Sequence, residues 1–127
     1  MSQYLKLKIQ VQRRDAAVAA LRALGFEPEL SEQADLRLTT YSGTDAGAAC
    51  HLRVRRDKIG SLTNDFGINL DTGQIWLCDY ARRTKLGEFL QEYSTQALMA
   101  TYQEEGRYCY RVEDAETGKT HVFVSGG

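Results

Sequence analysis

The segment 84–105 constrains the fold more than any other stretch, because it has the pattern of one long amphipathic helix. Apolar residues recur at helical spacing along one face, at Leu86, Phe89, Leu90, Tyr93, Ala97 and Ala100. Polar residues occupy the opposite face, at Glu88, Gln91, Glu92, Ser94, Gln103 and Glu104. Thr84 is a suitable cap for the first turn, and Gly106 stands where helices commonly end. We therefore expect this helix to pack on a sheet.

Alternation of apolar and polar residues predicts strands on both sides of the helix. Residues 4–12 have the clearest alternation of a half-buried strand. The other predicted strands cover residues 34–41, 50–54, 66–70, 75–78, 108–113 and 120–124, with a flexible connection over 41–47. Turns at 71–73 and 114–118 join two pairs of them as hairpins. A short helix over 16–24, capped by Asp15 and ended by Gly25, follows the first strand.

The order of these elements predicts an α+β fold, β-α-β-β-β-β-α-β-β. We expect an antiparallel or mixed sheet of about six to seven strands, with both helices packed on one face. The 127 residues are enough to bury a core without disulfides or metals, and they form a single domain over 1–127.

Composition and charge exclude several functional classes. A net charge of -1 argues against a dedicated nucleic-acid binder. No apolar run approaches the roughly 18 residues of a membrane span, and residues 1–4 lack the apolar core of a signal peptide. We therefore expect a cytoplasmic protein that is not associated with a membrane. The cysteines form no CxxC pair, which indicates buried thiols rather than a disulfide framework or a zinc site.

The histidines and cysteines do not form a convincing catalytic pair. Cys50 and His51 are neighbours on a strand, so their side chains point to opposite faces. A nucleophile would require Cys50 or Cys109 to meet His121 across the sheet, and nothing in their spacing demands it. We interpret the chain as non-enzymatic.

Three carboxylates in the central hairpin have a simpler explanation than catalysis. Asp65, Asp71 and Asp79 have the chemistry for acid–base work or for holding a hard metal. Their positions at a turn and at strand ends instead favour hydrogen bonds to free backbone amides. The glycines show none of the phosphate-loop spacings. We expect no cofactor and no bound metal.

Two sets of residues are candidates for contact with a partner. Basic residues gather at Arg53, Arg55, Arg56 and Lys58, and again at Arg82, Arg83 and Lys85. Such a surface suits RNA or an acidic protein, although charge runs are more often solvated, and aromatic residues for base stacking are absent from it. The chain also closes on Gly126-Gly127, as ubiquitin-like modifiers and sulfur carriers do, because a tail without side chains threads an activating enzyme.

Several motifs carry a family resemblance, at a Leu24-Gly25 pair after the first helix, Phe66-Gly67, Leu77-Cys78-Asp79-Tyr80, Phe89-Leu90, Thr95-Gln96, Gly106 and Gly118. At these positions the chain resembles the cyanobacterial and plastid family called conserved reading frame 35, with its bacterial relatives of unknown function. The chain departs from the family at Asn69-Leu70, where a Trp is common, and at its last residues. The resemblance implies an accessory role beside an ATPase of the AAA class, without implying an activity.

Three functions therefore remain open. The first is an adaptor that acts by binding another protein, for which the resemblance suggests an AAA-class ATPase. The second is a modifier activated at Gly127, with a conjugation enzyme as its partner. The third is RNA binding through the basic strand face.

Overall fold

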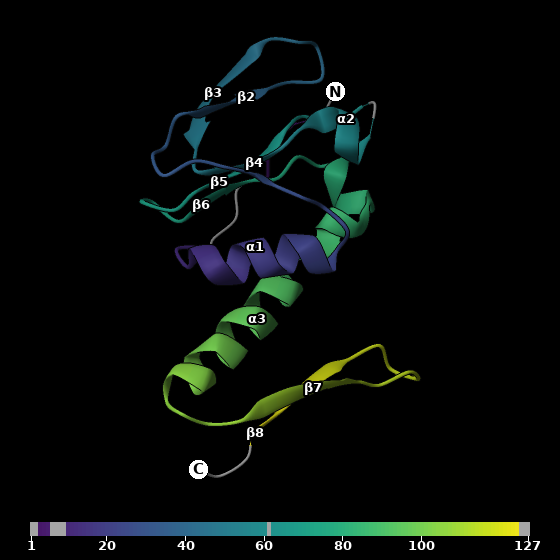
Figure 1. Ribbon diagram of the computed structural model, residues 1–127. Helices are drawn as coiled ribbons and strands as arrows, with labels where there is room; N and C mark the ends of the chain where they lie inside the picture. Colours follow the sequence, from purple (N-terminus) through teal and green to yellow (C-terminus); the bar gives the residue numbers. More distant parts are fainter. Residues whose placement is uncertain (1–2, 6–9, 61, 125–127) are drawn as a thin grey trace.

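The computed structural model describes residues 3–5, 10–60 and 62–124, and it confirms an α+β fold (Figure 1). The helices are α1 (Arg14–Ala23), α2 (Arg56–Ile59) and α3 (Phe89–Glu104), with 3-10 turns η1 (Ala81–Arg83) and η2 (Lys85–Glu88). The strands are β1 (Glu29–Leu30), β2 (Leu36–Thr39), β3 (Asp45–Cys50), β4 (Leu52–Val54), β5 (Phe66–Asn69), β6 (Gln74–Trp76), β7 (Cys109–Glu113) and β8 (Thr120–Val124).

The paired strands are antiparallel, and they are divided among three sheets instead of being joined in one. The largest sheet has the order β1-β4-β5-β6, while β2-β3 and β7-β8 form separate two-stranded sheets. The predicted strand over 50–54 is split, because Cys50 ends β3 and Leu52 begins β4. The predicted connection over 41–47 is shorter than expected, since β3 begins at Asp45.

The main core lies between the four-stranded sheet and α1. Helix α1 buries Ala16, Ala17, Ala20 and Leu21. These small residues allow the helix to approach the sheet closely, and the sheet contributes buried Phe66 and Ile68 from β5. The ring of Phe89 meets that of Phe66 edge-on, with centroids 5.2 Å apart. This packing joins the start of α3 to the same core.

The β2–β3 hairpin forms a third layer on the other side of the sheet, opposite α1 (Figure 1). Its apolar contacts form a small cluster of Leu38, Ala48 and Cys50. A Cβ on Gly67 would lie 2.7 Å from the Leu38 side chain and 2.8 Å from Cys50 Sγ. Position 67 in β5 therefore needs a glycine, because the hairpin approaches the backbone there.

The predicted first strand, residues 4–12, lies partly outside the described residues. Of its described parts, Tyr4 bridges to Cys78, and the Leu5 amide donates to the Leu77 carbonyl at 2.8 Å. The Val11 amide donates to the carbonyl of Gly73, also at 2.8 Å. Both described ends thus run beside β6 and the residues that flank it.

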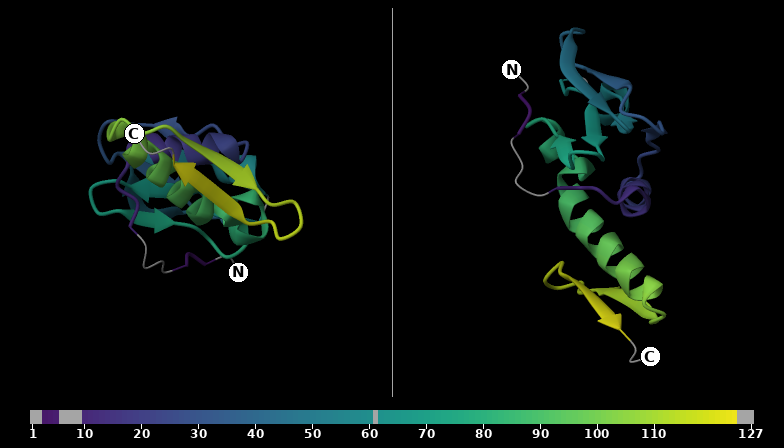
Figure 2. Two further views of the ribbon diagram at one scale, coloured as in Figure 1. Left: turned by 90° about the horizontal axis from the view of Figure 1, so that it is seen from below. Right: turned by 90° about the vertical axis from the view of Figure 1, so that its left-hand side faces the viewer.

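The long predicted helix over 84–105 is a helix only from Phe89. Before it the chain makes η1 and η2, where Thr84 Oγ1 caps the second turn by accepting from the Leu86 amide at 3.2 Å. Leu86, Phe89 and Tyr93 are buried in the core, as predicted. Beyond Tyr93 the helix leaves the sheet, and its remaining turns run between α1 and the β7–β8 hairpin (Figure 2).

Candidate interaction surface

Two basic residues, Arg53 in β4 and Arg55 just after it, are held by ion pairs within the molecule. Arg53 Nε donates to Glu29 Oε2 at 2.6 Å, and Arg55 Nε donates to Glu29 Oε1 at 2.8 Å. Partial burial raises the pKa of the Glu29 carboxyl, but the two guanidinium groups outweigh this effect and hold that pKa below its ordinary value. Glu29 is therefore ionised at neutral pH and compensates much of this positive charge.

The other arginines of the predicted basic surface have different surroundings. Arg56 begins α2, and its Nε donates to the Thr63 carbonyl at 3.1 Å. Arg82 and Arg83 are exposed in η1, where the Arg83 guanidinium lies 5.6 Å from the centre of the Tyr80 ring. RNA binding by these residues stays a prediction, and the ion pairs of Glu29 weaken it.

The positions of the cysteines and histidines argue against a nucleophilic Cys–His pair. Burial raises the pKa of the Cys50 thiol to about 12, so the thiolate is scarce at neutral pH. Cys109 and His121 lie on opposite faces of the β7–β8 hairpin, because Cys109 pairs with Val124 whereas His121 pairs with Val112. His51 is buried, and its Nδ1 accepts from the Leu70 amide at 2.9 Å.

The carboxylates Asp65 and Asp79 bind backbone amides, as their strand-end positions predict. Buried Asp65 accepts from the amides of Thr39 and Arg56, each at 2.7 Å, which ties β2 and α2 to the start of β5. Asp79 accepts from the Gln3 amide at 3.1 Å. In the described part of the chain, no group of His, Cys, Asp and Glu is arranged to hold a metal ion.

The positions shared with the resembling family are mostly structural. Phe66, Gly67 and Phe89 belong to the packed centre of the molecule, and Gly106 follows α3 with φ +79°. Gln96 lies in α3, where its Nε2 donates to Glu92 Oε2 at 3.3 Å.

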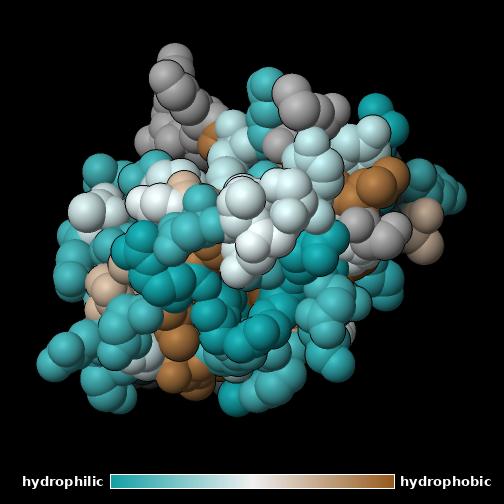
Figure 3. Space-filling view, turned by 90° about the horizontal axis from the view of Figure 1, so that it is seen from above, coloured by the Kyte–Doolittle hydropathy of each residue, from teal (hydrophilic) through white to brown (hydrophobic). Residues whose placement is uncertain are grey.

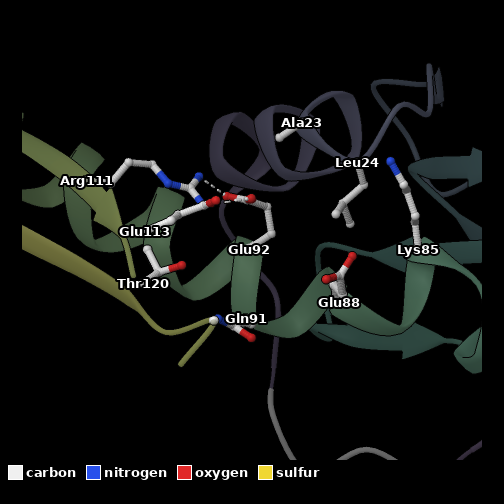
Figure 4. A pocket seen from close by; sticks show the side chains of 10 residues that line it. Ala23, Leu24, Lys85, Glu88, Gln91, Glu92, Arg111, Glu113 and Thr120 are labelled. Carbon is white, nitrogen blue, oxygen red and sulfur yellow. Dashed lines mark hydrogen bonds and ion pairs between the residues drawn. The ribbon is translucent and has the colours of Figure 1, made fainter. Parts of the chain in front are cut away.

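A polar pocket of about 250 Å³ lies where α1, α3 and the β7–β8 hairpin meet (Figure 4). Arg111 of β7 donates to Glu92 of α3 at 2.5 and 3.1 Å, and to Glu113 at 2.9 Å. Lys85 and Glu88 line the other end. The Glu92 side chain is only 12% exposed, so this ion pair anchors the hairpin to the helix. The described lining of the pocket is mostly charged and polar, and it includes neither cysteine nor histidine.

The outer face of the β7–β8 hairpin is the largest grouping of exposed aromatic side chains among the described residues. Because directly paired residues share a face, Tyr110 lies beside Phe123, and Val112 beside His121. The exposed fractions are 69% for Tyr108, 46% for Tyr110, 45% for Val112 and 47% for Phe123. We call Tyr108, Tyr110, Val112, His121 and Phe123 the aromatic face.

The rings of the aromatic face contact one another in a row. Tyr110 and Phe123 are stacked, with centroids 5.3 Å apart and planes 19° from parallel. Tyr108 lies 6.2 Å from Tyr110, and His121 lies 6.4 Å from Phe123. Viewed from below, β7 and β8 lie in front of α3, so the hairpin forms one end of the molecule (Figure 2).

The opposite end of the molecule has a different character. Seen from the side of the β2–β3 hairpin, the surface is mainly hydrophilic, with scattered apolar residues (Figure 3). A sheet face that stays in water normally carries polar side chains. The aromatic face departs from this pattern, which makes it the strongest candidate for a functional surface.

Sequence reasoning predicted both strands of this hairpin but missed the aromatic face. The alternation of Tyr108, Tyr110 and Val112 shows that they share a face. It does not show which face packs on α3. A feature of the sequence that could have identified the inner face is the opposite charge of Arg111 and Glu92, which form an ion pair between the hairpin and α3.

No family model, curated protein or solved structure matches this chain. The resemblance to the conserved reading frame 35 family therefore stays a prediction. Gly126 and Gly127 lie outside the described residues, so the modifier hypothesis also stays a prediction. No helix among the described segments is long and apolar enough to cross a membrane.

Proposed function

We propose that this protein is a non-enzymatic adaptor that binds another protein through the aromatic face of β7–β8. The observation that carries the proposal is the exposure of Tyr110 and Phe123 on an antiparallel sheet face that normally would be polar. Exposed aromatic residues supply much of the binding energy at protein interfaces, and contiguous apolar patches commonly mark interaction sites.

The geometry favours a protein over a nucleic acid as the partner. The rings of Tyr110 and Phe123 are stacked on each other, so at most one face of each ring is left for a base. The hairpin between residues 107 and 124 has three basic and three acidic residues, so it does not attract phosphates. Its most buried arginine, Arg111, is engaged by Glu92.

The resemblance adds an AAA-class ATPase as the first partner to test. Affinity purification from the native host, with the carboxyl terminus untagged, compares the wild type with a Tyr110→Ser/Phe123→Ser double variant. Leu30→Ser serves as the matched control, because Leu30 is similarly exposed but lies in β1 of the central sheet. Intact mass, measured with and without reducing agent, accompanies each purification.

We expect the wild type and Leu30→Ser to retain the same stoichiometric partner, and the double variant to lose it. Equal recovery with the double variant would exclude the aromatic face as the binding surface. A covalent adduct, adenylate or thiocarboxylate at Gly127 would instead favour a modifier. In that case, deleting Gly126 and Gly127 should abolish function and leave the fold intact.

A further inference from the structure

The β7–β8 hairpin has backbone groups on both outer edges that no other described residue binds. The Asp114 amide donates to the Lys119 carbonyl at 2.8 Å, so these two residues bond across the hairpin. Pairs that bond across an antiparallel ladder alternate with pairs that do not. The next pair, Glu113 with Thr120, therefore turns its amides and carbonyls outward, as does every second pair after it. Within the described part of the chain, no hydrogen bond from outside the hairpin reaches these outward groups.

The other edge strands among the described residues are partly covered or short. Thr39 of β2 is bonded by Asp65, whose amide donates to the Thr39 carbonyl at 2.9 Å. In β3 the Ala49 carbonyl accepts from Asn69 Nδ2 at 3.1 Å. Described N-terminal residues bond the carbonyls that flank β6, and β1 has only two residues. Such devices keep strand edges from pairing with other chains, and the hairpin lacks them.

Of the two edges of the hairpin, that of β8 is the less protected. It reads Thr120-His121-Val122-Phe123-Val124 and contains no lysine, arginine, aspartate, glutamate or proline. Strand β7 instead carries Arg111 and Glu113. Charged side chains and proline are the residues that discourage pairing at an edge. The five pairs of the hairpin follow one another without a register shift, so β8 is a regular template along its length.

A strand added beside β8 would continue the aromatic face. Side chains alternate between the two faces of a sheet, so every second residue of the added strand would lie beside His121 and Phe123. Aromatic and β-branched side chains are favourable neighbours of an aromatic ring across two strands. A charged residue in the added strand would find no ion-pair partner on β8. The edge therefore suits an uncharged segment with aromatic or β-branched residues at alternate positions.

We infer that β8 binds an uncharged, extended segment of another protein, which joins the β7–β8 hairpin as a third strand. The backbone of the segment bonds to the outward groups of Thr120, Val122 and Val124, and its alternate side chains extend the aromatic face. Backbone bonds supply affinity in this mode of recognition, and alternate side chains supply specificity. This inference rests on the proposed function, because it names the kind of segment that the adaptor's partner presents.

Amide-resolved hydrogen exchange by NMR on the full chain tests the inference. The probes are end-blocked peptides of about seven residues, in which threonine alternates with valine, isoleucine, phenylalanine or tyrosine. In the free protein the amides of Thr120 and Val122 should exchange quickly, whereas those of His121 and Phe123 are protected within the hairpin. At about 1 mM, at least one peptide should slow exchange at Thr120 and Val122 by about fivefold or more, and leave Glu113 unchanged.

Two proline variants distinguish the edges of the hairpin. Thr120→Pro and Glu113→Pro each remove one outward amide from a directly paired position, so neither removes a bond within the hairpin. Thr120→Pro should weaken peptide binding at least about fivefold, whereas Glu113→Pro should bind like the wild type. Slow exchange at Tyr110 and Phe123 verifies that the hairpin is formed in each variant, and the exchange pattern of the wild type is decisive without either variant.

Failure of every peptide to protect the β8 amides overturns the inference, as does protection of the β7 edge instead. Protection that appears on raising the protein concentration alone would assign the edge to a second copy, and it would also overturn the inference. The two proposals fail separately. If no peptide binds and the Tyr110→Ser/Phe123→Ser variant still loses its partner, strand addition alone is refuted. If a peptide adds to β8 and that variant keeps its partner, the proposed function alone is refuted.

Discussion

At the scale of single residues, the β2–β3 hairpin approaches the central sheet closely at Gly67. Its missing side chain lets Leu38 and Cys50 of the β2–β3 hairpin pack against the backbone of β5. A larger residue must displace two buried side chains, and both belong to the small cluster of Leu38, Ala48 and Cys50. The stability of the whole layer therefore depends on one position.

Gly67→Ala should lower the free energy of unfolding by about 1–3 kcal/mol, because the added methyl group overpacks this contact. Urea denaturation measures the change. Gly60→Ala is the matched control, since a Cβ there would meet only Thr63 Cγ2 at an ordinary 3.6 Å and the backbone is extended. The control should be as stable as the wild type. Equal stability of Gly67→Ala would contradict the packing described for β5.

The burial of the Cys50 thiol predicts a loss of stability in alkaline solution. The unfolded thiol ionises from about pH 9, whereas burial keeps the folded thiol protonated up to about pH 12. Between these values the unfolded state has released its proton, so stability falls by about 1.4 kcal/mol per pH unit. Denaturation midpoints at pH 8 to 11 should fall less steeply for Cys50→Ala than for the wild type. If the midpoints of the two proteins fell equally with pH, folding would not shift the ionisation of the Cys50 thiol.

At the scale of elements, the β7–β8 hairpin depends on α3 for its support. A two-stranded sheet is marginally stable alone. The inner face of this one is attached by the ion pair of Arg111 with Glu92 and by the Cys109 thiol, which donates to the Met99 carbonyl at 3.5 Å. The hairpin is thus the element most easily released without unfolding the core.

Arg111→Met should speed amide hydrogen exchange in β7 and β8 by about tenfold or more, because it leaves the largely buried carboxylate of Glu92 without its cation. Exchange in β4 and β5 should not change. Arg107→Met is the control, since the exposed Arg107 side chain makes only long contacts, with Glu105 at 3.9 Å and with the centre of the Tyr102 ring at 5.9 Å. Faster exchange throughout the molecule in Arg111→Met would mean that the hairpin and the core unfold as one unit.

Local patterns predicted the elements better than their arrangement. The 71–73 and 114–118 turns and their flanking strands follow from neighbouring residues alone, and both hairpins were found. The start of α3 was predicted too early, because the chain forms η1 and η2 before Phe89. Gly87 permits the close approach of these two turns, since a Cβ there would lie 2.1 Å from the Arg82 carbonyl oxygen. The division into three sheets depends on which layer each hairpin meets, and periodicity carries no such information.

At the scale of the whole molecule, the two ends differ in their packing and in the residues that they expose. The α1, central-sheet and β2–β3 layers form a packed core with a mainly hydrophilic surface on the β2–β3 side (Figure 3). Helix α3 carries the β7–β8 hairpin away from the sheet and presents its aromatic face at the far end (Figure 2). Under the proposed function, this separation would let the hairpin engage a partner without disturbing the core.

Site-specific photo-crosslinking in the native host tests this role most directly. A benzophenone amino acid replaces Tyr108, the most exposed residue of the aromatic face, and in a second protein it replaces Leu30 of β1. Position 108 should give discrete adducts with a partner protein, and position 30 should not. Absence of adducts at position 108, or the same adducts at both positions, would contradict a protein-binding role for the aromatic face.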